Sequence, residues 1–378
     1  MSEKICIIGD GITALMLTKV LLDLNIKIDL VNQNIFNKKK FSTRTFAISN
    51  NNFMFLKKKS ILSEKIDSSW KINKINVFNT KSKNISSLLL DFKNKENNPI
   101  FYMIRYNNFF FNLKSKIKKN PLLKILNIKN ENNLLKNQKI KNNYNLVINC
   151  NGSNFINKNF FFRKINKKYN AVAFTTIIKH KKFSNNIASQ YFTKLGPMAF
   201  LPIAKNYTSV VWSVNLDNQK NKNCISDAII KNKIRELFSL KSNNLIFSSI
   251  NKFDLNFSIS KEYYKKNILA FGDTLHKIHP LAGQGINMTI RDIKILKSII
   301  EKKINLGLEI NENVLVEFTN KTKSYNFLFA KSIDFTEKYF SINNSAFNIY
   351  SEKLFNKINK NQLVKFFFMN FADKGFII

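Results

Sequence analysis

Residues 269–287 have the sequence LAFGDTLHKIHPLAGQGIN, which contains a strand, a polar loop and the start of a helix. The apolar run 268–271 is typical of a buried strand, and Asp273 follows it where strands of open α/β sheets place ligand-binding groups. Gly283 and Gly285 make the loop conformationally permissive, and apolar residues recur at helical spacing after them. A helix amino terminus beside a strand end predicts a site for a group that carries or develops negative charge.

The first 32 residues predict a second part of such a site. Residues 4–8 form an apolar, strand-like run, and Gly9, Gly11 and Ala14 follow it in the spacing G-x-G-x-x-A. A helix and another strand come next, so the segment predicts a dinucleotide-binding βαβ unit. The second strand ends at Asn32, where a carboxylate that binds ribose is expected. An amide bonds a ribose hydroxyl more weakly than a carboxylate does.

Several segments together resemble one enzyme family. Residues 272–287 have the pattern G-D-x-x-H-x-x-x-P-x-x-G-Q-G-x-N, followed by Arg291 and Asp292. This resembles the second flavin motif of the single-component FAD-dependent aromatic hydroxylases, in the form found in the ubiquinone-biosynthesis branch. Residues 44–49 resemble that family's R-x-x-A-x-S segment, and residues 196–202 its G-P-x-A-x-L-P strand. The resemblance implies an α/β fold like that of p-hydroxybenzoate hydroxylase, with a Rossmann-like FAD-binding domain, an interleaved antiparallel-sheet substrate domain and C-terminal helices.

The resemblance also implies how the chain divides and what its site contains. The expected FAD-binding domain comprises residues 1–70, 98–167 and 261–335, the substrate domain residues 71–97 and 168–260, and the C-terminal helical segment residues 336–378. Residues expected around the flavin ring are Pro280, Gly283, Gln284 and Gly285. Residues expected to bind the cofactor are Gly9, Gly11, Ala14, Asn32, Arg44, Asn151, Gly152, Gly272, Asp273, Gly285, Ile286 and Asn287.

Three of these positions have specific implied roles. Asp273 is expected to hold the ribityl chain of FAD, and Arg44 to lie against the cofactor near its pyrophosphate. Asn151 stands where the family has the aspartate of an Asp-Gly motif, and Tyr102 where it often has glutamine. No general acid or base is assigned. No metal site is expected, because His276 and His279 have no partnering cysteine or acid in a ligand spacing.

Other segments have two or more interpretations. Phe192, Met198, Phe200 and Trp212 indicate either the lining of an apolar pocket or sheet core, and for any one of them core is favoured. Residues 122–144 indicate a weak hairpin, and His180, which precedes two lysines, indicates a surface histidine. The apolar tail 366–371 predicts either a helix docked on the core or a membrane-facing patch.

The amino-acid composition indicates which partners and which cellular compartment to expect. The 378 residues include 62 Lys and Arg against 24 Asp and Glu, a net charge of +38. Because lysine is spread along the chain and not gathered in one basic helix, we interpret the charge as compositional drift, with attraction to an anionic membrane surface as a secondary effect, and expect no nucleic-acid partner. The three cysteines have no metal-like spacing, and Cys6 and Cys150 lie in apolar runs, so a reducing compartment is expected. The first strand begins near residue 3 and no run of about 20 apolar residues occurs, so we expect a cytoplasmic protein, peripheral at the inner membrane face.

The function that the resemblance implies is hydroxylation of the aromatic ring of a polyprenyl phenol in ubiquinone biosynthesis. The implied chemistry uses FAD, O2 and NAD(P)H and passes through a flavin C4a-hydroperoxide. An assembly at the membrane is an implied partner. Two alternatives keep the fold: an isoprenoid reductase or oxidase, and a non-catalytic scaffold in which Asn32, Tyr102 and Asn151 are signs of decay. A nucleic-acid-binding protein rests on the charge alone and would bind DNA with a steep salt dependence.

Overall fold

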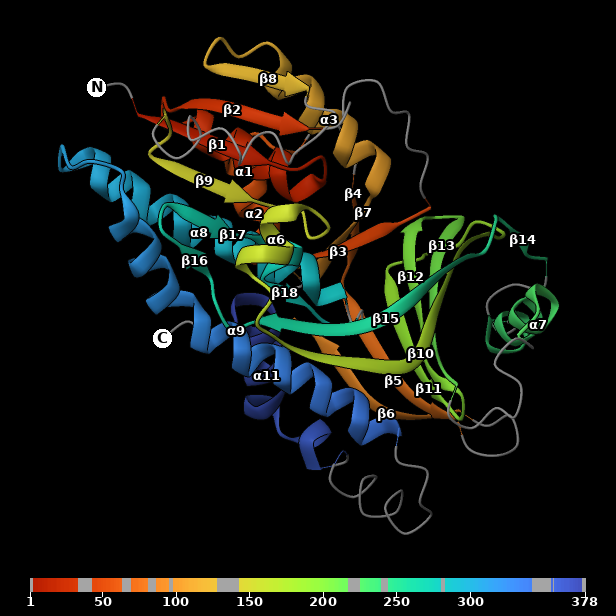
Figure 1. The fold of residues 1–378 in the computed structure, drawn as a ribbon. Helices are drawn as coiled ribbons and strands as arrows, with labels where there is room; N and C mark the ends of the chain where they lie inside the picture. The colour runs from red at the N-terminus through yellow and green to blue at the C-terminus, as the bar shows by residue number, and fades with distance from the viewer. Residues whose placement is uncertain are drawn as a thin grey trace.

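The protein is described here by a computed structural model, and its elements form two large sheets joined by a small one (Figure 1). The parallel sheet lies at the upper left of Figure 1 and the antiparallel sheet at the right. The residues that the structure describes are 3–32, 43–62, 69–80, 86–94, 98–127, 143–216, 225–238, 244–279, 283–341, 355 and 357–375.

The first sheet has the strand order β16-β17-β9-β1-β2-β8. All neighbouring pairs are parallel except β16 with β17. Its inner strands are continuous apolar runs because both faces of the sheet are covered. The strands are β1 (Lys4–Ile8), β2 (Lys27–Asn32), β8 (Leu123–Asn127), β9 (Leu146–Asn149), β16 (Tyr264–Lys265) and β17 (Ile268–Ala270). The expected weak hairpin over 122–144 begins with β8, which pairs with β2 in parallel, and its remainder, residues 128–142, lies outside the described part.

Helices pack on this sheet and share one core with it. Helix α1 (Ile12–Leu22) buries almost every residue and packs against α3 (Tyr106–Lys118) and α8 (Gln284–Asn305). The long helix α9 (Glu312–Ser341) packs along α8. The short elements α6 (Phe155–Phe160) and η2 (Gly272–Thr274) follow β9 and β17 at the carboxyl edge of the sheet.

The second sheet is mostly antiparallel, with the order β18-β15-β10-β13-β12-β11-β5-β6 and β14 beside β10. Helix α7 (Asp227–Phe238) covers one of its faces (Figure 1). The strands are β5 (Lys74–Thr80), β6 (Ser86–Lys93), β10 (Lys164–Lys179), β11 (Ile187–Thr193), β12 (Gly196–Ala204), β13 (Tyr207–Asn215), β14 (Ile246–Phe247), β15 (Asn251–Ser260) and β18 (His276–Lys277).

The expectation of a surface position for His180 is wrong. Its ring is buried beneath α7, 4.7 Å from the ring of Phe183 and 5.2 Å from that of Phe238. Its Nε2 lies 3.0 Å from Thr208 Oγ1. The two lysines that follow it in sequence are exposed, so its neighbours in the chain misrepresent its own environment.

A small third sheet, β3-β7-β4, joins the other two. Its strands are β3 (Thr45–Ser49), β4 (Ser69–Ile72) and β7 (Phe101–Arg105), and α2 (Asn50–Lys58) follows β3. Ala47 and Met103 of this sheet share an apolar cluster with Ala188 and Ile203 of the antiparallel sheet. The third sheet therefore fixes how the antiparallel sheet faces the start of α8, which contacts β3.

The C-terminal helix α11 (Gln362–Lys374) packs against α2 and α8. No residue of this helix is fully buried. None of the helices in the described ranges is long and apolar enough to cross a membrane.

Candidate functional site

The turn between β1 and α1 is shaped by three small residues. Gly9 has φ +150°, and a Cβ there would lie 3.1 Å from Cys150 Cβ and 3.4 Å from Ala14 Cβ. Gly11 is the N-cap of α1, where no side chain caps the helix, and a Cβ there would meet nothing within 4 Å. Space in front of uncapped helix amides is what a diphosphate requires. The turn therefore fits a dinucleotide.

The loop after β17 lies against the same helix. Gly272 has φ +64°, and a Cβ there would lie 2.7 Å from Thr13 Cγ2. Thr274 holds the loop from inside, because its Oγ1 accepts the Phe271 N–H at 2.6 Å and lies 3.1 Å from the Asn149 carbonyl oxygen. Asp273 is exposed between these two fixed residues. The fold thus places the expected ribityl-binding carboxylate beside the dinucleotide turn.

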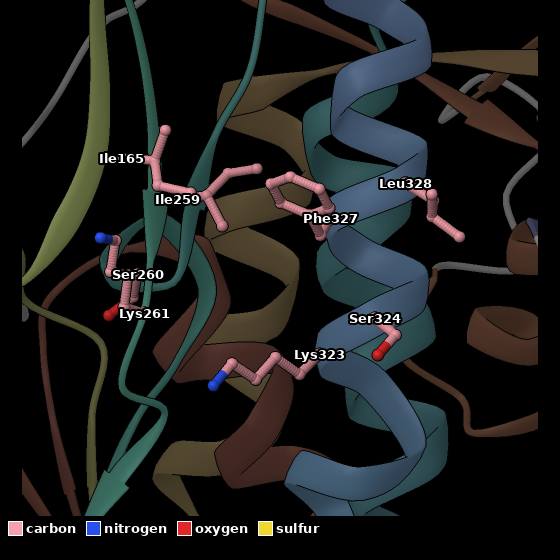
Figure 2. Close-up of a pocket in the computed structure, with 8 residues that line it drawn as sticks. All are labelled: Ile165, Ile259, Ser260, Lys261, Lys323, Ser324, Phe327 and Leu328. Atoms are coloured by element: carbon pink, nitrogen blue, oxygen red, sulfur yellow. The ribbon is translucent and has the colours of Figure 1, made fainter.

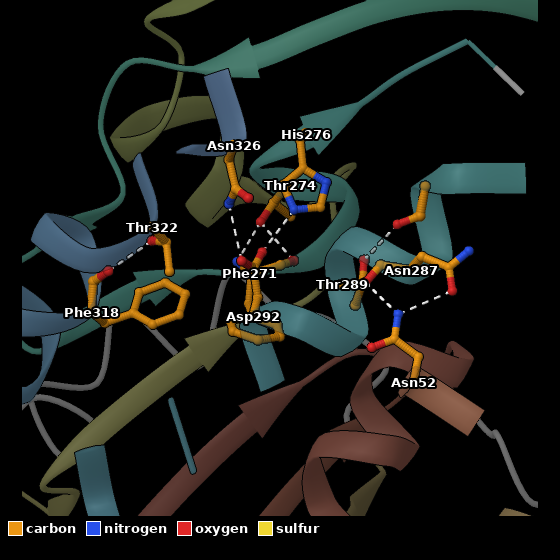
Figure 3. A network of polar contacts seen from close by, with 11 residues as sticks. Asn52, Phe271, Thr274, His276, Asn287, Thr289, Asp292, Phe318, Thr322 and Asn326 are labelled. Atoms are coloured by element: carbon orange, nitrogen blue, oxygen red, sulfur yellow. Dashed lines mark hydrogen bonds and ion pairs between the residues drawn. The ribbon is translucent and has the colours of Figure 1, made fainter. Parts of the chain in front are cut away.

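The start of α8 is held against β3 by hydrogen bonds of Asn287. Asn52 completes this set of bonds, which we call the asparagine clamp (Figure 3). Gly283, the N-cap, has φ +63° and a Cβ there would lie 3.1 Å from Ala47 Cβ. Asn287 Nδ2 donates to the Ala47 carbonyl at 2.8 Å, and Asn287 Oδ1 accepts the Ser49 N–H at 2.9 Å. Asn52 Nδ2 donates to the same Oδ1 at 3.1 Å. Because its amide is fully used on the protein, Asn287 acts on the site by holding the backbone of α8 in place.

Two buried acceptors in this region lack a partner among the described residues: Asn52 Oδ1, beside Asn287, and Gln284 Oε1, at the start of α8. Pro280 and residues 281–282 lie outside the described part, as does the side chain of Asn32. Gly285 and Ile286 continue the helix, and a Cβ at Gly285 would meet only Ile278, at 3.8 Å. An orphaned acceptor beside free helix amides suits a ligand that has both donors and acceptors, as a flavin ring has.

Arg44 lies at the other end of β3 from the clamp. Its guanidinium lies 6.0 Å from the ring of Tyr106 and 5.9 Å from that of Phe46. Burial raises the pKa of the Tyr106 phenol, while Arg44 lowers it and Asp10 raises it. Arg44 and Asp10, which lies between Gly9 and Gly11 in sequence, therefore both influence the Tyr106 phenol electrostatically.

Asn151 and Gly152 follow β9 at the same edge. Asn151 Oδ1 accepts from the Ser153 N–H at 3.0 Å and from Ser153 Oγ at 2.9 Å, and its own N–H donates to Asn149 Oδ1. A Cβ on Gly152 would lie 4.0 Å from Thr274 Cγ2. An aspartate at position 151 would accept the same two bonds, so the asparagine removes a charge and keeps the turn.

Two histidines of the second motif are buried beneath the site. His276 Nε2 lies 2.8 Å from Asp292 Oδ2, and Asn326 Nδ2 donates to Asp292 Oδ1 at 3.0 Å (Figure 3). This pair ties β18 to α8 and α9. His279 packs edge-on against Tyr169 at 5.3 Å, and burial lowers its pKa to about 4, so it is neutral at physiological pH.

The four apolar residues expected either in a pocket or in the sheet core divide between the two faces of the antiparallel sheet. Met198, Phe200 and Trp212 are core residues that pack with α7, as favoured for each of them from the sequence. Side chains alternate along a strand, so Phe192 shares the opposite face of its strand with Ala188. Residues missed from the sequence include Ala188 itself, Leu201, Ile203 and Tyr207, which belong to the cluster around Ala47 beside Gly283. Strand alternation is the signal that separates the two sets.

A second concave region lies away from these motifs. It is a groove of about 660 Å³ between α9 and the strands β10 and β15, and Phe327 points from α9 toward Ile165 and Ile259 (Figure 2). Its remaining lining residues are Ser260, Lys261, Lys323, Ser324 and Leu328. None of the glycine-rich turns contributes to it, so this groove is separate from the candidate site. Within the described residues no group of three or more His, Cys, Asp or Glu side chains has the arrangement of a metal site.

Comparison with protein families and curated proteins identifies the cofactor. Residues 151–305 match the FAD binding domain family. The ubiquinone biosynthesis monooxygenase COQ6 of Dictyostelium discoideum is 28% identical over 190 residues, which are 42% of this chain and 38% of that protein. The 3-demethoxyubiquinol 3-hydroxylase of Escherichia coli is 28% identical over 155 residues, 41% of this chain and 40% of that protein. These matches span less than half the length of either relative.

Solved structures confirm the expected fold class. The p-nitrophenol 4-monooxygenase PnpA of Pseudomonas putida matches all of this chain and all of its own, with a TM-score of 0.77 at 13% identity. PqsL of Pseudomonas aeruginosa, a probable FAD-dependent monooxygenase, matches 97% of this chain and 99% of its own, with a TM-score of 0.67 at 13% identity. At this identity the likeness concerns the fold alone.

Proposed function

We propose that this chain, which resembles the FAD-dependent hydroxylases of ubiquinone biosynthesis, is an FAD-dependent monooxygenase that hydroxylates an aromatic ring. One observation carries the proposal: three glycine turns meet at the carboxyl edge of the parallel sheet. Gly272 packs on α1 just behind Gly11, and Gly283 caps α8, which contacts both α1 and the Gly272 turn. Arg44 directly precedes β3, the strand on which Gly283 packs. Sheets of this kind bind dinucleotides at this edge.

In this proposal the chain's own groups hold and orient the cofactor. The uncapped amides after Gly11 bind the diphosphate, with Arg44 beside them, and Asp273 binds the ribityl chain. The amino terminus of α8, held by Asn287, stabilises negative charge at the pyrimidine edge of the reduced ring. When bound, FAD supplies the two-electron chemistry that activates O2 and transfers one oxygen atom.

The apolar cluster around Ala47 supports a water-excluding pocket for an aromatic substrate ring. Ala188, Ile203 and Met103 are buried there, next to the backbone that carries Gly283. A dry pocket prevents loss of the oxidising equivalent to water.

The proposal has finer parts that rest on the resemblance and on the relatives' names. They are a polyprenyl phenol as substrate, the flavin hydroperoxide as the route, NAD(P)H as reductant, a peripheral position at the anionic inner membrane face, and a place in a ubiquinone-biosynthesis assembly. The expected division of the chain into an FAD-binding domain, a substrate domain and a C-terminal segment is part of the same proposal.

The first experiment is a titration of the purified protein with FAD, in which binding is measured by visible absorption spectroscopy. Wild type is expected to bind about one FAD per chain. Gly11→Val fills the space before α1 at a residue with an ordinary φ of −97°, so it should fold, at a cost of about 1 kcal/mol or less, and lose FAD. Gly307→Ala is the matched control, because it strains a residue with φ +67° far from the motifs and should keep FAD.

The reaction is then tested with a polyprenyl phenol, NADPH and ¹⁸O2. Incorporation of one labelled atom into the ring is expected. Flavin oxidation or reduction that depends on substrate but inserts no oxygen would favour the isoprenoid reductase or oxidase. A folded wild type that binds no FAD would refute the proposal and leave a non-catalytic scaffold.

A further inference from the structure

Helix α11 has an apolar face that no described residue covers. Leu363, Phe366 and Phe367 are 78%, 56% and 63% exposed, and their spacing of i, i+3 and i+4 places them on one side of the helix. Phe368, beside them, is 44% exposed. These four large apolar side chains lie on two successive helical turns and form a contiguous patch. Exposed apolar patches of this kind usually mark a binding surface.

The charges around this patch are positive. Lys357, Lys360 and Lys374 are exposed at the two ends of the segment. Asp373 is the only acid between residues 357 and 375, and its carboxylate accepts a hydrogen bond from the backbone of α2. An apolar helical face flanked by lysines is complementary to the interface of a membrane that contains anionic lipids.

The last turn of α11, beyond the exposed patch, is docked on the protein near the candidate site. Phe371 packs against Phe329 at 5.0 Å. Asp373 Oδ1 accepts the Asn51 N–H at 2.8 Å, and the Asp373 carbonyl accepts from Ser49 Oγ at 3.1 Å. The Asn51 amide belongs to the first turn of α2, so the carboxylate caps that helix from outside.

Ser49 connects this docking to the start of α8. Its hydroxyl donates to α11, and its backbone N–H donates to Asn287 Oδ1 at 2.9 Å. Asn287 in turn donates to the carbonyls of Ala47 and Gly283. Two residues therefore separate the C-terminal helix from the N-cap of the helix that faces the proposed flavin.

We propose that α11 binds an anionic lipid surface through Leu363, Phe366, Phe367 and Phe368, and that its Asp373 contacts make the lipid-bound helix stabilise the amino terminus of α8. The lipid surface thereby regulates the flavin site. The second half of this inference rests on the proposed function for its meaning, although the contact chain itself does not.

Lipid binding is tested by sedimentation of the full chain with vesicles of phosphatidylcholine, alone or mixed with phosphatidylglycerol. Wild type should pellet with the anionic mixture, and high salt should weaken binding. Phe366→Ser with Phe367→Ser should lower partitioning by roughly tenfold or more. Phe162→Ser is the matched control, because Phe162 is 62% exposed and lies outside α11.

Three results would overturn the lipid contact. One is equal binding by wild type and the Phe366/Phe367 double variant. Another is equal binding to both vesicle types. The third is a change in oligomeric state, measured by light scattering, that the double variant abolishes without altering vesicle binding, since a second copy of the chain would then be the occupant.

Coupling is tested by hydrogen exchange of the amides in residues 284–290, with and without anionic vesicles. Vesicles should slow exchange in wild type by roughly fivefold, the effect expected of one capping bond. Ser49→Ala removes the hydroxyl that donates to α11 and keeps the backbone N–H that donates to Asn287, so it should bind vesicles yet show no slowing, and Ser49→Thr, which keeps a hydroxyl, should restore it. Unchanged exchange in vesicle-bound wild type would overturn the coupling.

The exchange measurement is made on protein with and without added FAD. Slowed exchange in a chain that binds no FAD would refute the proposed function and keep this inference. FAD binding and hydroxylation in a chain whose α8 amides exchange at the same rate with and without vesicles would support the proposed function and overturn the coupling.

Discussion

His279 allows a quantitative test of how tightly the second motif is buried. The side chain is 2% exposed and immediately precedes Pro280, the residue expected against the flavin ring. Burial lowers its pKa from 6.5 to about 4, against the opposing influence of Asp334, while Lys167 lowers it further. Asp334 is shared, because it also accepts from the Tyr169 hydroxyl at 2.8 Å and pairs with Lys167 at 2.7 Å.

The sign and size of the pH effect follow from this shift. Above pH 6.5 the histidine is neutral in both states and contributes no pH dependence. Between pH 6.5 and about 4 the unfolded chain takes up a proton and the folded chain does not, so stability falls as the pH falls. The full effect, about 2.5 pKa units at roughly 1.4 kcal/mol each, is about 3 kcal/mol, of which about 2 kcal/mol is lost by pH 5.

The assay is urea denaturation of wild type and His279→Phe at about pH 7.5 and about pH 5. Phenylalanine keeps a ring against Tyr169 and removes the titration. The free energy of unfolding of wild type should fall by about 2 kcal/mol more than that of the variant, because all carboxylates are common to both. Parallel losses in the two proteins would refute the burial of a neutral imidazole at this position.

Other residues give further predictions. Gly272→Ala should lower the unfolding free energy by about 1–3 kcal/mol, and Thr13→Ala in the same chain should restore part of it by removing the 2.7 Å contact; thermal unfolding that shows no rescue would assign the whole loss to φ. Asn151→Asp should leave stability within about 0.5 kcal/mol and tighten FAD binding a few-fold in a fluorescence titration, whereas weaker binding would mean that the neutral amide is required. Asp292→Ala should cost about 3 kcal/mol in urea denaturation, and adding His276→Ala should cost little more; additive losses would contradict a coupled buried pair.

The parts of the fold that the sequence predicts are those fixed by local chemistry. Gly283 adopts φ +63°, in line with the permissive loop expected there, whereas Gly285 lies inside α8. The first βαβ unit is likewise local, since β1, α1 and β2 follow one another and pair directly. In each case the interactions that decide the structure lie within a few residues of the pattern that predicts it.

The parts that the sequence does not predict depend on distant contacts. Strand β8 is a weak pattern by itself, and only its parallel pairing with β2 makes it part of the sheet. Met198 and Leu201 lie on one strand, and alternation separates their faces without indicating which face meets α7 and which meets Ala47. Asn52 carries no motif, yet it completes the clamp on Asn287.

The polar groups of the candidate site indicate how it would hold the proposed cofactor. The amide of Asn287, the hydroxyl of Thr274 and the carboxylate of Asp292 all bond to the protein's own groups, and so does Oδ1 of Asn151. What these bonds fix is backbone: helix amides, left-handed glycines and the space before Gly11. Backbone amides suit an anionic diphosphate and keep their charge pattern whatever side chain follows. We therefore expect a site built this way to tolerate an asparagine at position 151, because the missing carboxylate would remove one contact and leave the backbone cradle unchanged.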